Sequence, residues 1–195
     1  MREYYYLNLI CGTNGTGKTT MVIDMIEKLN QRTLIINPSE EYKWNKYERV
    51  KYSDAKELRT FTGIKQITPR DDFDADDEEL YRDILRTVYY NYSGGTLVID
   101  DARMFINANV GNLVGKFLVK RRQKRLDIFC VFHSINQIPP KFFDHGTHLI
   151  LFKTNEDWKE SLRKIPGSRK EEVAAALERI NKQSNNLHYH EIIQF

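Results

Sequence analysis

Cysteine is scarce in this chain: Cys11 and Cys130 are the only two in 195 residues, and both lie in apolar runs. A disulfide-stapled secreted domain is therefore excluded, and the pattern favours two reduced thiols in the core of an intracellular protein. Long apolar runs are lacking as well, since none approaches the roughly 20 residues that a membrane-spanning helix needs. The first residues also lack the apolar core of a signal peptide. We therefore expect a soluble protein without a direct membrane span.

Neither sign of charge dominates, because 30 lysines and arginines face 27 aspartates and glutamates, for a net charge of +3 at pH 7. This small excess does not by itself indicate a nucleic-acid partner, so the distribution of the charges matters more. No internal repeat is visible, and 41% of the residues are hydrophobic, which is enough to bury a core. The length predicts a single domain over residues 1–195, with a C-terminal helix–strand extension over about 156–195.

Short continuous apolar runs alternate with segments whose apolar residues recur at helical spacing. The expected strands are Tyr4–Cys11, Thr33–Ile36, an edge strand near Ile64–Thr68, Thr96–Ile99, Ile128–Phe132, His148–Phe152 and Leu187–Phe195. The expected helices are Lys18–Asn30, Ala55–Phe61, Leu80–Tyr92, Leu113–Lys124 and Lys170–Asn181. Apolar strands that alternate with helices are typical of an α/β fold with a mostly parallel sheet.

One segment matches the phosphate-loop pattern G-x-x-x-x-G-K-[ST], after a predicted strand and at the start of a predicted helix. Glycines let the backbone curl so that successive N–H groups point at phosphate oxygens, and the helix N-terminus adds positive potential. Lys18 then reaches the β- and γ-phosphates and the Thr19 hydroxyl ligates Mg²⁺, so we expect ATP and Mg²⁺ as cofactors. The residues expected to bind the nucleotide are Gly12, Thr13, Asn14, Gly15, Thr16, Gly17, Lys18, Thr19 and Thr20.

A second motif is the apolar run Leu97–Ile99, which ends in Asp100 and Asp101. A strand that ends in an acid delivers a carboxylate to the edge of the sheet where the phosphates bind. We expect Asp100 to hold Mg²⁺ through water and Asp101 to polarise the attacking water. An apolar strand with a terminal aspartate is common, so the pairing with the phosphate loop gives this motif its weight.

A third feature is the segment Lys116–Arg125, which has six basic residues in ten. Three interpretations fit this segment. It is a solvated helix face, it carries an arginine that reaches the γ-phosphate of a neighbouring subunit, or its lysines contact nucleic-acid phosphates. His133 and Ser134 then follow a predicted central strand, where a polar side chain senses the γ-phosphate or caps the loop. His188 and His190 are expected on one side of the last strand, with no third metal ligand near them in the sequence.

Together these motifs resemble the FtsK-HerA superfamily of ring ATPases. The chain is most similar to the short genome-packaging ATPases of tailless, membrane-containing double-stranded DNA viruses, and it also resembles the ATPase domain of filamentous-phage assembly proteins. The resemblance implies a P-loop NTPase of the RecA/ASCE type, a three-layer sandwich. It also implies that the Tyr4–Cys11 strand lies between the strands of Ile128 and His148, with the Asp100 strand beyond that of Ile128.

The resemblance implies roles for residues that match the family's motifs. Lys18 and Thr19 match the nucleotide-binding pair, and Asp100 matches the magnesium acid. Asp101 stands where the family usually has glutamate, which leaves the position of the attacking water open.

For the remaining positions the resemblance leaves alternatives. Arg122 falls where the family has a trans-acting arginine, with Arg121 and Arg125 as competitors. The family's sensor position falls near His133, while Gln137 follows a few residues later.

At the level of function, the resemblance implies an ATP-driven motor that translocates double-stranded DNA into a capsid. Its partners would be double-stranded DNA, further copies of the chain in a pentameric or hexameric ring, and capsid or membrane vertex proteins. Its location would be the host cytoplasm or the virion.

Two other classes of function stay open. A small-molecule P-loop kinase would need an arginine-rich lid and an acceptor-binding acid after the second strand, for which Glu40–Glu41 is the only candidate pair. A nucleotide switch or scaffold would bind without hydrolysis. Hydrolysis of ATP with and without double-stranded DNA or small acceptors discriminates among these classes.

Overall fold

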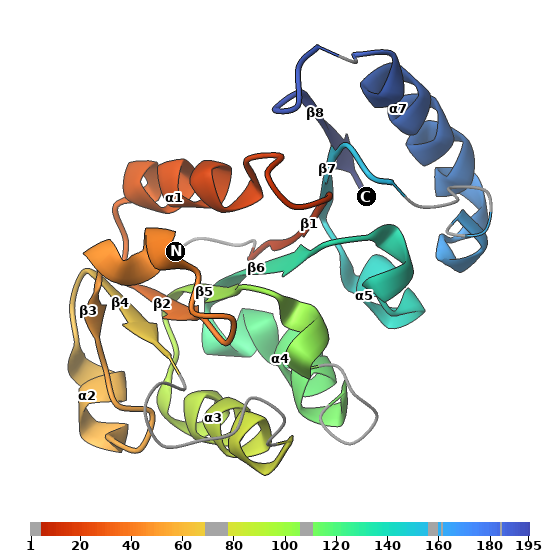
Figure 1. Cartoon of the computed structure of the whole chain (residues 1–195). Coiled ribbons are helices and arrows are strands. Elements are labelled where there is room, and N and C mark those ends of the chain that lie inside the picture. The colour runs from red at the N-terminus through yellow and green to blue at the C-terminus, as the bar shows by residue number, and fades with distance from the viewer. Residues whose placement is uncertain (1–4, 69–77, 106–110, 156–159, 161, 184) are drawn as a thin grey trace.

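The computed structural model of the protein describes residues 5–68, 78–105, 111–155, 160, 162–183 and 185–195, and these form an α/β structure around one twisted sheet (Figure 1). The strands are β1 (Leu7–Cys11), β2 (Thr33–Ile36), β3 (Glu48–Arg49), β4 (Ile64–Ile67), β5 (Gly95–Ile99), β6 (Leu126–Phe132), β7 (His148–Phe152) and β8 (His190–Gln194). The helices are α1 (Lys18–Leu29), α2 (Ala55–Thr60), α3 (Glu78–Asn91), α4 (Gly111–Lys124), α5 (Pro140–His145) and α7 (Lys170–Lys182).

The sheet has the order β3-β4-β2-β5-β6-β1-β7-β8. Every pairing is parallel except that of β8, which runs antiparallel to β7. The expected position of β1 between β6 and β7, with β5 beyond β6, is therefore confirmed. The expected α/β class with a mostly parallel sheet is confirmed as well.

Two expectations about the strands are wrong. The segment Ile64–Ile67 is not an edge strand, because β3 pairs with its outer side. β3 has only two residues, Glu48 and Arg49, both exposed and charged, so no apolar pattern marks it in the sequence. The last strand begins at His190 rather than at Leu187, because a turn around Asn186 precedes it.

Apolar side chains cover both faces of the sheet, because successive residues of a strand point to opposite sides. On one face, Val22 and Ile26 of α1 pack against Ile10 and Phe129 of the central strands. A larger core on the other face includes residues of α3, α4, α5 and α7. Figure 1 shows α1 on one side of the sheet and α3 and α4 on the other, which is the expected three-layer arrangement. Each fully buried aliphatic or aromatic side chain contributes about 1.5–3 kcal/mol to such cores.

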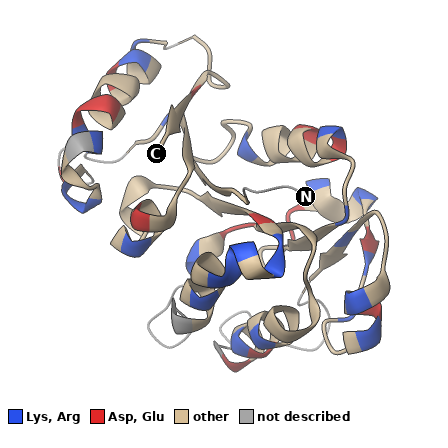
Figure 2. Ribbon diagram, turned by 180° about the vertical axis from the view of Figure 1, so that it is seen from behind, with Lys and Arg blue, Asp and Glu red and all other residues tan. Residues whose placement is uncertain are grey.

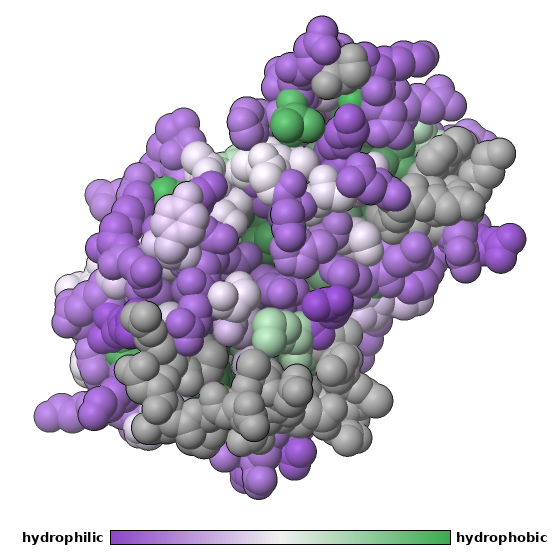
Figure 3. Space-filling model, in the orientation of Figure 1, coloured by the Kyte–Doolittle hydropathy of each residue, from purple (hydrophilic) through white to green (hydrophobic). Residues whose placement is uncertain are grey.

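The loops that follow β1, β2, β5 and β6 leave the sheet at the same edge, because these strands are parallel. In open parallel sheets the crevice outside the carboxyl ends of the strands is the usual place for a ligand. Over the described ranges, no helix combines the length and the apolar character needed to cross a bilayer. The face of the molecule in Figure 3 is mainly hydrophilic, with hydrophobic residues in small separate areas.

Candidate nucleotide-binding site

The segment between β1 and α1 has the backbone of a phosphate loop. Gly15 and Gly17 have φ values of 79° and 93°, which residues other than glycine rarely adopt. At Gly12 an added Cβ would lie 2.5 Å from the Cβ of Phe152, so only glycine fits against β7. These three glycines thus allow the chain to turn sharply from the sheet into α1.

Hydrogen bonds hold this loop in place. The backbone N–H of Thr13 donates to the carbonyl oxygen of Lys153 at 2.9 Å. The carbonyl oxygen of Thr13 accepts from the Thr16 hydroxyl and from Nζ of Lys18, both at 2.8 Å. α1 begins at Lys18 with no side-chain cap at Gly17, so its first N–H groups remain available to an anion.

A cavity of about 480 Å³ opens beside the loop, in the size range of a small-molecule site. Its lining combines phosphate-loop residues with the ends of β2, β5 and β6. The lining residues are Asn14, Gly15, Gly17, Lys18, Thr19, Ser39, Glu41, Lys43, Asp100, Asp101, Val131 and His133. Of the residues expected to bind nucleotide, Gly12, Thr13 and Thr16 shape the loop from behind, and Thr20 is exposed and accepts a 3.0 Å hydrogen bond from Nζ of Lys43.

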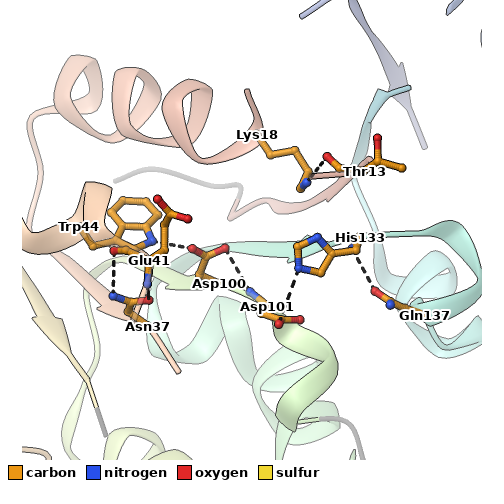
Figure 4. Close-up of polar contacts among 9 residues, drawn as sticks. All are labelled: Thr13, Lys18, Asn37, Glu41, Trp44, Asp100, Asp101, His133 and Gln137. Carbon is orange, nitrogen blue, oxygen red and sulfur yellow. Dashed lines mark hydrogen bonds and ion pairs between the residues drawn. The ribbon is translucent and has the colours of Figure 1, made fainter. Parts of the chain in front are cut away.

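Asp100 directly follows β5 and is almost fully buried at the floor of the cavity (Figure 4). Its Oδ2 accepts a 2.5 Å hydrogen bond from Nε1 of Trp44, and its Oδ1 accepts one from the backbone N–H of Asp101 at 3.1 Å. Burial raises the pKa of Asp100, and the hydrogen bond from Trp44 opposes this shift. Because tryptophan is only a donor, Trp44 holds the Asp100 carboxyl in one orientation.

Asp101 and His133 face each other across the same cavity. His133 Nε2 lies 3.7 Å from Asp101 Oδ2, and Asp101 Oδ1 is buried without a hydrogen-bond partner among the residues of the structure that are described. Asp101 has a left-handed backbone, with φ of 45°, which turns the chain away from the sheet directly after Asp100. The side chain of Gln137 instead accepts from the backbone N–H of His133 at 3.0 Å, so Gln137 caps the loop while His133 reaches the cavity.

Lys18 is the buried cation of the cavity. Burial lowers its pKa, and the carboxylates of Asp100, Asp101 and Glu41 act in the opposite direction. An anionic ligand at the loop would add a stronger partner for this ammonium group than the Thr13 carbonyl oxygen that it now contacts.

The donor set fits Mg²⁺. The Thr19 hydroxyl and the Asp100 carboxylate line one cavity, and hard oxygen ligands of this kind suit Mg²⁺. Within the described ranges no three histidines, cysteines or acids converge on one point. At nucleotide sites, Mg²⁺ takes one or two side chains together with water and phosphate oxygens.

The loop after β2 contributes Ser39, Glu41 and Lys43 to the cavity, which the sequence analysis did not place there. Glu41 was considered only as an acceptor-binding acid of a kinase. The sequence gives only a weak signal for their place in the cavity, namely that polar residues follow a short β-branched strand. The strand order of the folded sheet then brings these residues beside Asp100.

The basic segment lies on α4, and Figure 2 shows its lysines and arginines along that helix. Arg121 is half-buried, and its guanidinium donates to the carbonyl oxygens of Tyr5 and Leu118. Arg122 and Arg125 are exposed. α4 ends just before β6 begins at the amino edge of the sheet, so these arginines lie at the opposite edge from the cavity of their own chain.

His188 lies before β8 rather than on it, so the expectation that His188 and His190 share one side of the last strand is wrong. Its Nδ1 is 3.2 Å from the carbonyl oxygen of Thr16, against the phosphate loop. The ring of His190 instead lies 4.8 Å from that of Phe152. The segment before β8 therefore packs on the outside of the phosphate loop.

Neither a protein-family model nor a curated protein sequence matches the chain. Solved structures do match it. The genome packaging NTPase B204 of Sulfolobus turreted icosahedral virus 2, in complex with ATP-γS, is 16% identical, with a TM-score of 0.70 over 99% of this chain and 93% of that chain. B204 is also solved with AMP and with AMPPCP, so that protein binds adenine nucleotides.

Two further solved structures are similar. VirB4 of Thermoanaerobacter pseudethanolicus is 10% identical, with a TM-score of 0.57 over 84% of this chain and 82% of that chain. The N-terminal domain of zonular occludens toxin from Neisseria meningitidis is 15% identical, with a TM-score of 0.50 over 98% of this chain and 94% of that chain. At these identities the likeness establishes the fold. The chain has the fold of the P-loop NTPases, and the resemblance to genome-packaging ATPases is confirmed at that level.

Proposed function

We propose that this chain is an ATP-hydrolysing subunit of a ring motor that translocates double-stranded DNA, in the packaging of a viral genome into a capsid. One observation carries the proposal: Lys18, Thr19, Asp100 and Asp101 line a single cavity at the carboxyl edge of the sheet. The fold shared with the genome packaging NTPase B204 supports the choice of this motor over other P-loop enzymes.

In this proposal the N–H groups of residues 12–20 bind the phosphates, and Nζ of Lys18 moves from the Thr13 carbonyl oxygen to the β- and γ-phosphates. Thr19 and Asp100 would hold Mg²⁺, which would supply charge neutralisation at the phosphate oxygens. Asp101 orients the attacking water, and His133 beside it responds to the loss of the γ-phosphate. Positioning and electrostatic stabilisation supply most of the catalysis in reactions of this kind.

In a ring, Arg122 would complete the site of a neighbouring subunit. Because α4 carries Arg122 to the edge of the sheet away from the cavity, Arg122 would act on the nucleotide of a neighbouring subunit rather than on its own. Arg121 is engaged by two backbone carbonyl groups, which favours Arg122 or Arg125 as the trans-acting residue. The exposed lysines of α4 would face DNA, and residues 1–195 would act as one unit.

Hydrolysis of ATP tests this proposal directly. Purified protein should release phosphate from Mg²⁺-ATP without any acceptor, and faster with double-stranded DNA. Lys18→Ala should lower hydrolysis by orders of magnitude with an unchanged circular dichroism spectrum, because it removes the main cation at the transferred phosphate. A Lys18→Ala variant that turns over ATP at the wild-type rate would contradict the assignment.

A small-molecule kinase is a second candidate, since Glu41 lines the cavity where an acceptor-binding acid would lie. Transfer of radioactive phosphate to nucleosides or nucleotides, in place of release to water, would favour the kinase. ATP binding with neither transfer nor release would favour a switch or scaffold.

A further inference from the structure

Glu41 brings a third carboxylate to the cavity, from a different strand than Asp100 and Asp101. Figure 4 shows its carboxylate pointing from the loop after β2 into the space below α1 that Lys18 and Asp100 border. Burial is the main influence on the pKa of both groups: it lowers the pKa of Lys18 and raises that of Asp100. The charge of Glu41 has a smaller effect and raises the pKa of both. Glu41 is therefore close enough to influence the groups proposed to bind phosphate and Mg²⁺.

A buried amide network holds Glu41 in this place. The side chain of Asn37 is fully buried; its Oδ1 accepts from the backbone N–H of Glu41 at 2.9 Å, and its Nδ2 donates to the Glu41 carbonyl oxygen at 3.3 Å. The same Nδ2 donates to Oε1 of Gln66, also at 3.3 Å. Both backbone groups of Glu41 are thus fixed by a single side chain that has no contact with solvent.

The network also sets where the following residues lie. Nε2 of Gln66 donates to the carbonyl oxygens of Trp44 at 2.8 Å and Tyr47 at 3.0 Å. Trp44 in turn donates to Asp100. The loop after β2 is therefore a rigid wall of the cavity, fastened to β4 on one side and to the end of β5 on the other.

Asp101 and Glu41 enter the cavity from different walls. Oδ2 of Asp101 lies 3.7 Å from Nε2 of His133, on the side of the cavity that β6 borders. The side chain of Glu41 is one methylene longer, and it enters the cavity from the opposite wall. A water that attacks the γ-phosphorus would then lie between an orienting group, Asp101, and an accepting group, Glu41.

We infer that Glu41 is a catalytic residue that accepts the proton of the attacking water. This inference rests on the proposed ATPase activity. The water oxygen forms a bond to the γ-phosphorus, the bond from that phosphorus to the β,γ-bridging oxygen breaks, and its electron pair leaves with ADP. The proton of the water passes to the Glu41 carboxylate and from there to solvent. A positioned base of this kind contributes about 10²- to 10⁴-fold to the rate.

Glu41 also has a local role that the experiment must separate from catalysis. Its Oε1 accepts from the backbone N–H of Lys43 at 3.4 Å, at the start of the 3₁₀ turn Tyr42–Lys46. Glu41→Gln retains an oxygen acceptor for this contact and removes only the basic carboxylate. Glu41→Asp retains a carboxylate and shortens its reach.

The test compares Glu41→Gln with Asp101→Asn and with Glu40→Gln, which removes the same charge from the neighbouring exposed residue outside the cavity lining. Phosphate release is measured in single turnover with no acceptor present, and ATP affinity is titrated separately. We expect Glu41→Gln to lose about 10²- to 10⁴-fold in rate with ATP affinity unchanged within about twofold. Glu40→Gln should keep the wild-type rate, and Glu41→Asp should be intermediate.

Wild-type turnover by Glu41→Gln, or an equal loss of ATP affinity and rate, would overturn the inference while leaving the ATPase in place. A wild-type chain that does not hydrolyse ATP, under conditions where it binds ATP, would overturn the proposed function and this inference together.

Discussion

At the scale of single residues, Trp44 carries the most specific structural prediction. It is fully buried, and its indole N–H donates to the Asp100 carboxylate. Trp44→Phe keeps the apolar volume but removes this donor, and the loss of a hydrogen bond to a charged group costs about 1.5–3 kcal/mol. We expect the midpoint of thermal unfolding to fall by roughly 3–12 °C. ATP affinity should fall more in the presence of Mg²⁺ than in EDTA, because Asp100 loses its fixed orientation.

Tyr47→Phe is the matched control for this variant. Tyr47 is in the same loop, and its hydroxyl donates at 2.9 Å to the exposed Glu27 rather than to a residue of the cavity. Loss of that hydrogen bond should leave the Mg²⁺ dependence of ATP binding unchanged. If Trp44→Phe also left it unchanged, Trp44 would be a core residue without influence on the metal acid.

The phosphate loop could be predicted from the sequence because its residues are neighbours along the chain and their spacing alone sets the geometry. Asp100 and Asp101 could be predicted because an apolar strand delivers them to the same edge. Glu41 and Lys43 could not be placed in the cavity, since their position depends on the strand order and on the buried bonds of Asn37. Such long-range contacts leave no periodic signal in the sequence.

At the scale of elements, β1, β2, β5, β6 and β7 could be predicted because each is a run of residues buried on both faces of the sheet. The strand β3 is the counterexample, with two exposed charged residues and no apolar side chain. Its place beside β4 depends on backbone pairing and on an ion pair in which Nζ of Lys65 lies 3.2 Å from Oε1 of Glu48.

The helix α4 carries the second prediction, that Arg122 acts in trans. Arg122→Ala should bind ATP normally through its own Lys18 and hydrolyse it poorly, since a guanidinium at the γ-phosphate of a neighbour is worth about 10³- to 10⁵-fold in rate. Mixing Arg122→Ala with Lys18→Ala subunits should restore activity. Interfaces that pair the intact Lys18 of one subunit with the intact Arg122 of the other are then complete.

Arg121→Ala separates this role from a structural one. Because Arg121 donates to the carbonyl oxygens of Tyr5 and Leu118, its loss should lower thermal stability. It should not be rescued by mixing with Lys18→Ala. If the mixture with Arg122→Ala stays inactive although mixed rings form, Arg122 is not the trans-acting residue and Arg125 is tested next.

At the scale of the whole molecule, the net charge is only +3, but positive charge is concentrated around α4. Lys116 and Lys120 are exposed one turn apart on α4, and Nζ of Lys141 from α5 lies close beside Gly115 of the same helix. Figure 2 shows that α4 is rich in basic residues over its exposed length. Two helices that are separate in the sequence therefore form one basic surface, and a ring would repeat it around its axis.

This basic surface predicts binding of double-stranded DNA that depends on salt and not on sequence. Neutralising about six phosphates makes the affinity fall roughly 10³-fold between 50 and 200 mM salt. Phosphate contacts carry no sequence information, so random-sequence duplexes should bind equally. The double variant Lys116→Gln/Lys120→Gln should weaken binding uniformly and reduce the slope of log affinity against log salt by about 2. Lys28→Gln, an exposed lysine of α1 on the other face of the sheet, should leave the slope unchanged. Equal slopes for the two variants would mean that DNA contacts a different surface, and no binding in the presence of ATP would favour the kinase.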